Sequence, residues 1–254
     1  MVDAHYSNPD LAALYDVFNA WNCSPQDPFY LDLVMAAGEA LDVGCGTGKL
    51  HRVAREQGHR GRLVGLDPAD AMLEVGRTER ADIEWTLGDL VQGPYDGQAG
   101  GPFEAEFDLV TMSGHAFQVF LTDEQTAANL AGARRALRPG ALLAFETRNP
   151  AARAWQRWTP EHERRVQAPD GRQAWSAHTL ERVEGDLVTF STAYGIQGWA
   201  EPGHSRSTLR FPEAQAVNAL LSGAGFEVQA QYGFWDRTPL TETSPEIITL
   251  ARAV

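Results

Sequence analysis

The sequence predicts an α/β fold: a mostly parallel, seven-stranded sheet with helices on both faces, and a small antiparallel β insertion after the fifth strand. Two observations support this prediction. Between residues 38 and 150, apolar runs of strand length alternate strictly with helical patterns, which is typical of a parallel sheet covered by helices. Between residues 151 and 211 the alternation stops, and period-two patterns replace it before the α/β pattern returns.

The first five strands and the helices between them follow from apolar periodicity and from residues that begin or end helices. Strand-like runs cover residues 38–44, 61–67, 81–89, 107–114 and 141–149, and the helical patterns cover 49–58, 69–80 and 122–140. Thr122 or Asp123 can cap the start of the third helix, and Pro139 with Gly140 is expected to end it. The glycine-rich stretch 93–103 is expected to be a loop.

The insertion is predicted to be an antiparallel hairpin with a third strand beside it. Residues 187–196 alternate with period two, and one face carries Val188, Phe190, Thr192 and Tyr194. A turn at 184–186 joins this strand to 176–183, and residues 207–212 add a third strand.

The core then resumes with a helix and two strands, at 212–226, 227–234 and 246–254. The predicted organisation therefore has four parts. They are an N-terminal helical cap at 1–38, the ligand-binding α/β core at 39–150, the β insertion at 151–211, and the C-terminal part of the core at 212–254.

Composition and charge argue against several classes of function. The formal net charge is −13 and no stretch rich in Lys or Arg offsets it, so a nucleic-acid-binding surface is not expected. The N-terminus lacks the segments of a secretory signal, and no apolar run approaches the ~18 residues of a membrane span. Cys23 and Cys45 form no CxxC pair, so a disulfide or a cysteine-ligated metal is not expected. We therefore expect a cytoplasmic protein that uses no metal and binds neither membrane nor nucleic acid.

A glycine-rich turn, ALDVGCGTGKLHR at residues 40–52, follows the first strand. A triphosphate-binding P-loop requires glycine at 43 and Ser or Thr at 50, but the chain has Val43 and Leu50, so Lys49 is expected to be solvated. A dinucleotide loop requires G-x-G-x-x-G, but the chain has G-x-G-x-G, and Asp42 would repel a pyrophosphate. Both phosphate interpretations are therefore disfavoured.

Together with its neighbours, this stretch resembles the first motif of class I S-adenosylmethionine (SAM)-dependent methyltransferases. LVGLDPADAML (63–73) is similar to the second motif, and LGDL (87–90) to the third. FDLVTMSG (107–114) and LRPGALLAFE (137–146) are similar to the fourth and fifth. The resemblance covers residues 38–150 closely and 210–254 loosely. It implies a Rossmann-like sheet with an antiparallel final strand, SAM as the methyl donor and S-adenosyl-L-homocysteine as the product.

The resemblance also implies contacts for the donor. The glycines let the backbone approach the amino-acid tail and ribose of SAM, and Asp42 attracts its ammonium group. Asp67 lies 19 residues beyond Gly48, where an acid accepts both ribose hydroxyls. By the same resemblance, Asp89 accepts from the adenine amino group, Leu90 offers its backbone amide, and Met72 packs on the ring. The expected cofactor-binding residues are Asp42, Gly44, Cys45, Gly46, Gly48, Asp67, Pro68, Met72, Gly88, Asp89, Leu90 and Ser113.

Structural alternatives exist for several of these residues. Asp42 can cap the glycine turn, Asp67 with Pro68 can cap the following helix, and Met72 can belong to the core. Cys45 is expected to be a small packing residue.

Two residues are candidates for catalysis. His115 follows the fourth strand, where the acceptor pocket of the family opens, and a neutral histidine can take a proton from a hydroxyl or amine. Its alternative role is to hydrogen-bond only backbone or SAM. Tyr15 with Asp16 resembles the YD pair of small-molecule N- and O-methyltransferases, whose tyrosine helps close the site over SAM.

The β insertion is expected to act as a lid that selects the acceptor, as in related methyltransferases. The expected substrate-binding residues are His115, Gln118, Arg148, Asn149, Trp155, Trp158, His178 and Tyr194. As a set they predict a partly aromatic pocket, in which the arginines leave room for an anionic acceptor group. Taken singly, a Trp or Tyr is more often buried for packing.

The predicted function is SAM-dependent transfer of a methyl group to an oxygen or nitrogen of a small molecule by in-line displacement. The alternatives are a protein methyltransferase and a SAM-binding module without turnover. A nucleic-acid methyltransferase is disfavoured because the segment after the fourth strand, MSGHAFQ, lacks the Asn/Asp-Pro-Pro-Tyr/Phe motif of base-amino methylation. The protein is expected to be a monomer or a homodimer.

Overall fold

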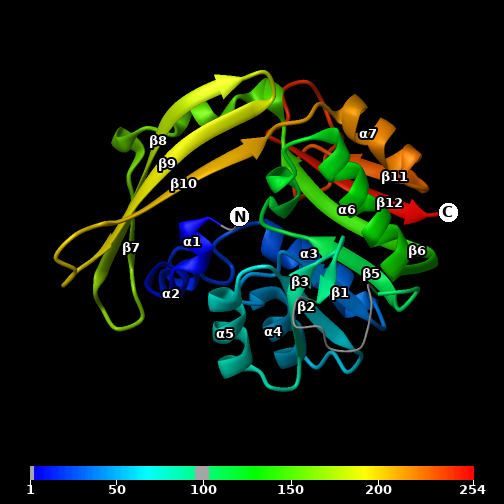
Figure 1. The fold of residues 1–254 in the computed structure, drawn as a ribbon, viewed down its shortest axis with the longest axis horizontal. Coiled ribbons are helices and arrows are strands. Elements are labelled where there is room, and N and C mark those ends of the chain that lie inside the picture. Colours follow the sequence, from blue (N-terminus) through cyan, green and yellow to red (C-terminus); the bar gives the residue numbers. More distant parts are fainter. Residues whose placement is uncertain (1–2, 95–102) are drawn as a thin grey trace.

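The main sheet has eight strands in the part of the chain that the structure describes. The structure is a computed structural model, and it describes residues 3–94 and 103–254. The spatial order of the strands is β11-β12-β6-β5-β1-β2-β3-β4 (Figure 1). Their bounds are β1 (Ala40–Val43), β2 (Leu63–Asp67), β3 (Glu84–Asp89), β4 (Gly93–Pro94), β5 (Phe107–Met112), β6 (Leu137–Arg148), β11 (Phe226–Tyr232) and β12 (Glu246–Ala253).

Strand direction follows the predicted pattern. Strands β3, β2, β1, β5 and β6 are parallel neighbours, whereas β12 runs antiparallel to both β6 and β11. This confirms the mostly parallel seven-stranded sheet with an antiparallel final strand, to which β4 adds a two-residue antiparallel edge beside β3. The strand order reverses between β1 and β5, and ligands of such sheets bind beyond the carboxyl ends of the strands at that point.

Helices cover both faces of this sheet, and the strands divide their side chains between the two sides. The helices are α3 (Gln26–Ala36), α4 (Lys49–Glu56), α5 (Asp70–Glu79), α6 (Asp123–Ala136) and α7 (Ala214–Gly223), with a short 3-10 turn η1 (Ala116–Val119) after β5. Ala40 and Leu63 pack with α3 and α4, whereas Leu41 and Val64 pack with α6 and α7. Consecutive residues of a strand therefore face different cores.

The same period of two gathers polar side chains on the α3–α4 face. Each of these polar residues lies an even number of positions along its strand from an apolar residue that packs with α3 and α4. Its side chain therefore points to that same face of the sheet. These polar residues are Asp42, Asp67, Thr111, Glu146, Arg148 and Glu246. All of them lie at the end of the sheet where the parallel strands finish.

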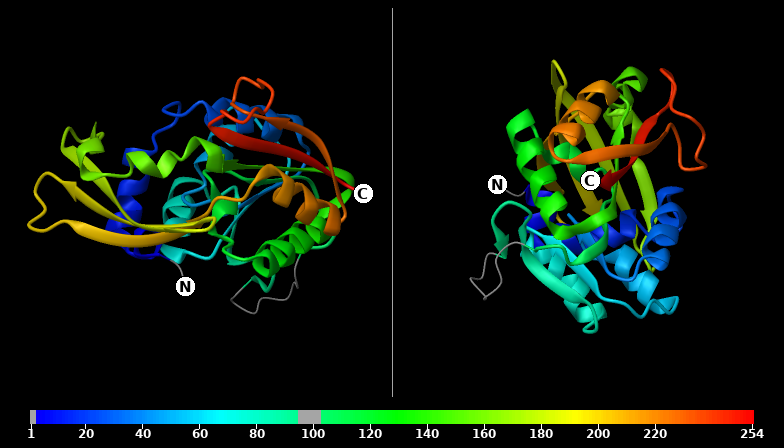
Figure 2. Two further views of the ribbon diagram at one scale, coloured as in Figure 1. Left: turned by 90° about the horizontal axis from the view of Figure 1, so that it is seen from above. Right: turned by 90° about the vertical axis from the view of Figure 1, so that its right-hand side faces the viewer.

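A second, antiparallel sheet follows β6. Its strands are β7 (Arg164–Gln167), β8 (Gln173–Glu184), β9 (Leu187–Ile196) and β10 (Gly203–Arg210), in the order β10-β9-β8-β7. Three short 3-10 turns lead into it: η2 (Pro150–Ala152), η3 (Ala154–Arg157) and η4 (Pro160–His162). The β9 face that was predicted from period two is buried, and β7 is an unpredicted strand. The sheet projects from the core beside the N-terminal helices (Figure 2).

Helices α1 (Ala4–Ser7) and α2 (Pro9–Phe18) lie between the two sheets. Leu11, Leu14 and Phe18 of α2 pack with Tyr194 and Ile196 of the second sheet. The other side of these helices contacts α5 of the core. The N-terminal segment therefore connects the second sheet to the core, while the four-part domain division remains a prediction.

The end of α6 differs from its predicted position, and the structure describes the segment 93–103 only in part. The helix α6 ends at Ala136, and Pro139 and Gly140 belong to β6 instead of ending the helix. The extra residues fit because the register between β5 and β6 slips after Phe107. Of the loop expected at 93–103, residues 95–102 lie outside the described residues, and Gly93–Pro94 form β4. None of the helices in the described ranges is long and apolar enough to cross a membrane.

Candidate active site

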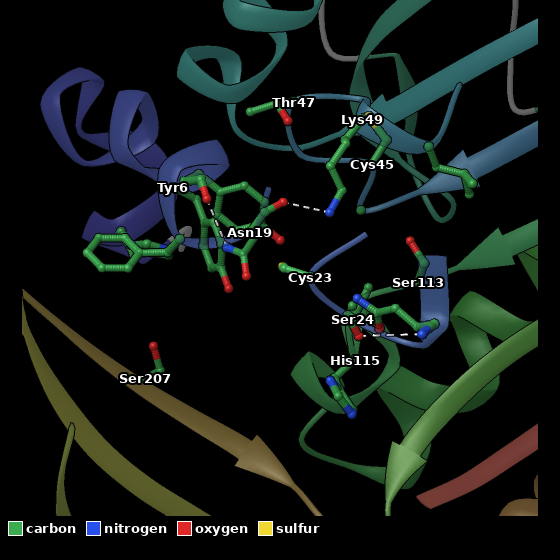
Figure 3. A pocket seen from close by; sticks show the side chains of 18 of the residues that line it. Tyr6, Asn19, Cys23, Ser24, Cys45, Thr47, Lys49, Ser113, His115 and Ser207 are labelled. Carbon is green, nitrogen blue, oxygen red and sulfur yellow. Dashed lines mark hydrogen bonds between the residues drawn. The ribbon is translucent and has the colours of Figure 1, made fainter. Parts of the chain in front are cut away.

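A cavity of about 550 Å³ opens at the carboxyl ends of β1, β5 and β6, bounded by the N-terminal helices and the second sheet. Several residues expected to bind cofactor or substrate line it together. They are Tyr15, Asp42, Gly44, Cys45, Ser113, His115, Arg148, Trp158, His178 and Tyr194. Figure 3 shows the glycine-loop residues Cys45 and Thr47 on one side, Ser113 and His115 after β5, and Ser207 of β10 across the space.

The three glycines of the loop have left-handed backbone conformations, with φ of 68° at Gly44, 56° at Gly46 and 71° at Gly48. Residues with side chains rarely adopt such angles. A Cβ at Gly44 would lie 2.9 Å from Ala116 Cβ, and one at Gly48 would lie 2.0 Å from Trp85 Cη2. Gly44 lines the cavity, whereas glycine at 48 is required by packing against Trp85.

Asp67 holds the glycine loop. Its Oδ2 accepts from the Gly46 backbone N–H at 2.8 Å, and its Oδ1 accepts from the Ala69 N–H at 2.8 Å. Burial raises the pKa of Asp67 to about 6, and these two backbone donors act in the opposite direction. The carboxylate thus joins the end of β2 to the loop after β1, and each oxygen keeps a second lone pair for a ligand.

Asp42 is a deeply buried acid of the site, with 1% of its surface exposed. Thr111 Oγ1 donates to its Oδ1 at 2.7 Å. Burial raises the pKa of Asp42 to about 7, the Thr111 hydrogen bond opposes this, and the carboxylates of Asp67 and Glu146 add to it. No cation among residues 3–94 and 103–254 pairs with Asp42, so a ligand cation in the cavity would be attracted to it.

The remaining cofactor candidates lie around the loop and outside the cavity lining. Met72 is 1% exposed and packs with Ala12, Ala69 and Tyr15, and its Cε approaches within 3.1 Å of where a Cβ on Gly46 would be. Asp89 accepts at one carboxylate oxygen from the backbone N–H of Val91 and of Gln92. Pro68, Gly88 and Leu90 continue the ends of β2 and β3.

Helix α2 is fixed to the glycine loop next to Tyr15. Asp16 accepts from Thr47 Oγ1 at 2.7 Å and from Arg52 Nη1 at 3.0 Å. Tyr15 lines the cavity, and burial raises its pKa, so its hydroxyl stays protonated at neutral pH. Its ring also packs near Gly46 and Gly114. This position suits a side chain that covers a ligand on the loop.

Lys49 differs from its expected role as a solvated residue. Only 17% of its side chain is exposed, and it lines the cavity. Its Nζ donates to the Asn19 carbonyl at 2.6 Å and lies 3.3 Å from Asp27 Oδ1 (Figure 3). The turn between α2 and α3 folds over the start of α4, which the local sequence around Lys49 does not reveal.

His115 is held between two carboxylates. Its Nε2 lies 3.0 Å from Glu246 Oε2, and its backbone N–H donates to Glu146 Oε1 at 2.6 Å. The Tyr30 hydroxyl donates to the other oxygen of Glu146. His115 Nδ1 is 3.9 Å from Glu146, has no hydrogen-bond partner among the described residues and is open to solvent.

Burial sets the protonation of this group. It lowers the pKa of His115 to about 3, with Arg148 acting in the same direction and Glu146 against it. Burial raises the pKa of Glu246 to about 7, which Arg148 opposes, and it raises the pKa of Glu146. Above pH 7 the ionised Glu246 carboxylate therefore accepts a hydrogen bond from the Nε2–H of the neutral His115 ring. That arrangement leaves Nδ1 as a lone-pair acceptor at the cavity.

The other substrate candidates divide between the cavity and its support. Gln118 is fully buried and accepts from Arg148 Nη1 at 2.9 Å. Asn149 donates to the Ser244 carbonyl at 2.8 Å and does not line the cavity. Trp155 also lies outside it and packs on Phe211 with ring centroids 4.7 Å apart.

Three residues of the second sheet that line the cavity have aromatic rings, His178, Phe190 and Tyr194, and they lie there with Arg164, Ser176, Ser207 and Leu209. His178 Nδ1 lies 2.8 Å from Thr192 Oγ1, and Tyr194 stacks on His5 with centroids 4.6 Å apart. Trp158 packs on Phe190 with centroids 4.4 Å apart. These rings line the same cavity as His115.

Sequence reasoning missed Tyr30, Glu146 and Glu246. The only sequence signal for them is the period of two, which places Glu146 on the same strand face as Ala144 and Glu246 on the same face as Ile248. Their meeting with His115 depends on pairing between β6 and β12, whose residues are about 100 positions apart in the chain. In the described residues, no group of three or more His, Cys, Asp or Glu is arranged to hold a metal.

Comparison with known proteins gives consistent similarities. Residues 40–140 match a family model described as a methyltransferase domain. The chain is 28% identical over 215 residues to cypemycin N-terminal methyltransferase of Streptomyces sp, covering 83% of this chain and 81% of that protein. It is 30% identical over 187 residues to malonyl-[acyl-carrier protein] O-methyltransferase of Salmonella typhimurium, covering 73% and 63%.

A solved structure shares the fold. The CcbJ methyltransferase from Streptomyces caelestis superimposes with a TM-score of 0.72 at 17% sequence identity, over 95% of this chain and 96% of that one. The similarity therefore includes both the core and the second sheet.

Proposed function

We propose that this chain is a class I SAM-dependent methyltransferase and that it methylates an oxygen or nitrogen of a small molecule bound in the cavity beside His115. The observation that carries the proposal is the presence of two different chemical sites in one cavity. Asp42 and the glycine loop form one end, and a histidine held by carboxylates lies after β5.

The residues at the loop end fit SAM. Asp42 is a buried acid that faces the cavity without a cationic partner among the described residues, and the SAM ammonium group would supply one. Gly44 lines the cavity with a left-handed backbone conformation, so no side chain of this residue stands between its backbone and a ligand. Asp67 keeps acceptor capacity for ribose hydroxyls while it holds Gly46. When bound, SAM supplies a methyl group on an already activated sulfonium.

The protein must then hold the acceptor, exclude water and accept a proton. The proposed proton acceptor for a hydroxyl or ammonium group is Nδ1 of His115. Its pKa of about 3 in the ligand-free chain makes it a weak base, so it acts only while the neighbouring carboxylates are ionised. The Glu246 carboxylate orients the ring through Nε2, and Glu146 stabilises the imidazolium that forms. Because the pKa of Glu246 is about 7, turnover should rise as the pH increases through neutrality.

The relatives leave the acceptor open. One is named as an N-terminal methyltransferase of cypemycin and the other as an O-methyltransferase of malonyl-[acyl-carrier protein]. The cavity volume of about 550 Å³ is that of a small-molecule site.

The test of the base is a comparison of His115→Ala with His204→Ala, whose histidine is exposed on β10. Transfer of a labelled methyl group from SAM to a panel of small phenols, carboxylic acids and amines gives turnover, and calorimetry gives the affinity for S-adenosyl-L-homocysteine. We expect His115→Ala to lower turnover about a hundredfold with little change in affinity, and His204→Ala to change neither. Undiminished turnover in His115→Ala would remove the histidine from the mechanism.

A further inference from the structure

Arg148 is a cation of the cavity that forms no ion pair with a described residue, although the charges of Glu246 and Glu146 act on it. It ends β6, and its side chain lies on the same face as Glu146 and Glu246. Both carboxylates are engaged elsewhere, because Glu246 bonds His115 Nε2 and Glu146 accepts from Tyr30 and the His115 N–H. Among the described residues Arg148 forms no ion pair, and its side-chain hydrogen bond goes to the neutral Gln118.

The free donors of Arg148 are open to the cavity. Its Nε and Nη2 have no acceptor in the described part of the chain, and both nitrogens remain accessible to solvent. Gln118 is itself held by the Arg210 carbonyl, to which its Nε2 donates at 2.6 Å. A guanidinium held in this way presents fixed donors, a geometry that suits a carboxylate or phosphate.

Arg148 belongs to the acceptor end of the cavity. Its charge acts on His115 and His178, and also on Glu246. It also lies 5.6 Å from the ring centre of Trp158, which connects to the second sheet through a hydrogen bond from the Leu180 N–H. The guanidinium thus contacts Gln118 and Trp158, and it makes no hydrogen bond or ion pair with the described residues of the glycine loop.

The surroundings of Arg148 define the rest of the ligand. Trp158 lies next to the guanidinium and packs on Phe190, and Tyr194 lines the same cavity. Two further cations line the cavity, namely Arg164 of β7 and Lys49, which pairs with Asp27. A guanidinium beside aromatic side chains suits a ligand that carries an anionic group on a flat body.

We propose that the methyl acceptor carries a carboxylate or phosphate bound by Arg148, on an aromatic or similarly flat body that packs against Trp158. This proposal rests on the proposed methyltransferase function and specifies its substrate class. Arg148 is a substrate-binding residue, and it orients the acceptor so that its oxygen or nitrogen faces His115.

The test uses the full chain loaded with S-adenosyl-L-homocysteine and three probes of similar shape: benzoate, phenyl phosphate and benzamide. Calorimetry measures their affinities for the wild type, Arg148→Met, Arg148→Lys and Arg165→Met. Arg165 neighbours Arg164 on β7, is exposed and does not line the cavity, so it serves as the matched control. Affinity for S-adenosyl-L-homocysteine is measured first in every variant.

We expect an anionic probe to bind the wild type and Arg165→Met at least tenfold more tightly than benzamide. Arg148→Met should abolish that preference without lowering the affinity for S-adenosyl-L-homocysteine. Arg148→Lys should keep part of the preference. Should Arg148→Met not fold, the wild type and Arg148→Lys still decide the question. Whichever anion binds more tightly identifies the group as carboxylate or phosphate.

Three results would overturn the proposal. One is the absence of an anion preference in the wild type, whether all three probes bind or none does. Another is an anion preference that survives in Arg148→Met. The third is a loss of affinity for S-adenosyl-L-homocysteine alone in Arg148→Met, which would assign Arg148 to the cofactor. Failure of the wild type to bind S-adenosyl-L-homocysteine would instead count against the proposed function.

Discussion

Replacing Asp42 by Asn should stabilise the ligand-free protein at high pH. The change keeps the size of the side chain and the acceptor for Thr111 Oγ1, and it removes a charge that is buried at 1% exposure. The pKa of Asp42 is about 7 in the folded chain, against the ordinary value of 3.8. Between these values the folded chain binds the proton more tightly than the unfolded chain, so the free energy of unfolding falls as pH rises.

The size of the effect follows from the same difference in pKa. The gap between 3.8 and about 7 corresponds to at most about 4 kcal/mol of stability lost by the wild type above neutral pH. The wild type loses almost all of this stability at pH 8 and little of it near pH 4. Asp42→Asn has no such cost, so the stability of the variant relative to the wild type should increase across this interval.

The assay is urea unfolding of the ligand-free wild type, Asp42→Asn and Asp32→Asn at pH 5 and pH 8. Asp32 is an exposed residue of α3, so its replacement removes a charge without changing the interior. We expect the advantage of Asp42→Asn over the wild type to grow by 1 kcal/mol or more between the two pH values. An advantage that is equal at both pH values would refute the argument. The variant should also bind S-adenosyl-L-homocysteine at least tenfold more weakly than the wild type does.

Three further outcomes follow from particular contacts. Gly48→Ala should lower the free energy of unfolding, measured with urea, by about 2–4 kcal/mol, because the new Cβ would meet the Trp85 ring. Gly58 also has a positive φ but open space around it, so Gly58→Ala should lower the free energy of unfolding by only about 1 kcal/mol. Asp67→Ala should lower the affinity for S-adenosyl-L-homocysteine at least tenfold and should speed hydrogen exchange of the Gly46 amide. Unchanged exchange of that amide would argue against the contact between Asp67 and the loop. Tyr30→Phe should cost about 1–3 kcal/mol in urea unfolding, because Glu146 loses a buried donor, and a neutral result would mean that water replaces the hydroxyl.

Much of the fold could be predicted because its signals are local. Alternating strands and helices indicate a parallel sheet, and the period of two in β9 indicates a sheet with one buried face. The end of α6 was misplaced because Pro139 and Gly140 fit a slipped register in β6, a feature that depends on the neighbouring strand. Strand β7 has no comparable pattern, since its burial alternates only weakly over four residues.

The candidate site was less predictable because its parts come from distant segments. The glycine loop and Asp67 belong to short motifs, and the structure brings them into direct contact. The partners of His115 lie on α3, β6 and β12, and their meeting follows from the topology of the sheet. Lys49 was misjudged for the same reason, because the turn that covers it comes from the N-terminal helices.

The most direct test of the account is calorimetric titration of SAM into the purified wild-type chain and into Asp67→Ala. We predict one molecule of SAM bound per chain by the wild type, and an affinity at least tenfold lower in the variant. Absence of SAM binding to a folded wild-type chain would contradict the central claim that this cavity is the site of a SAM-dependent methyltransferase.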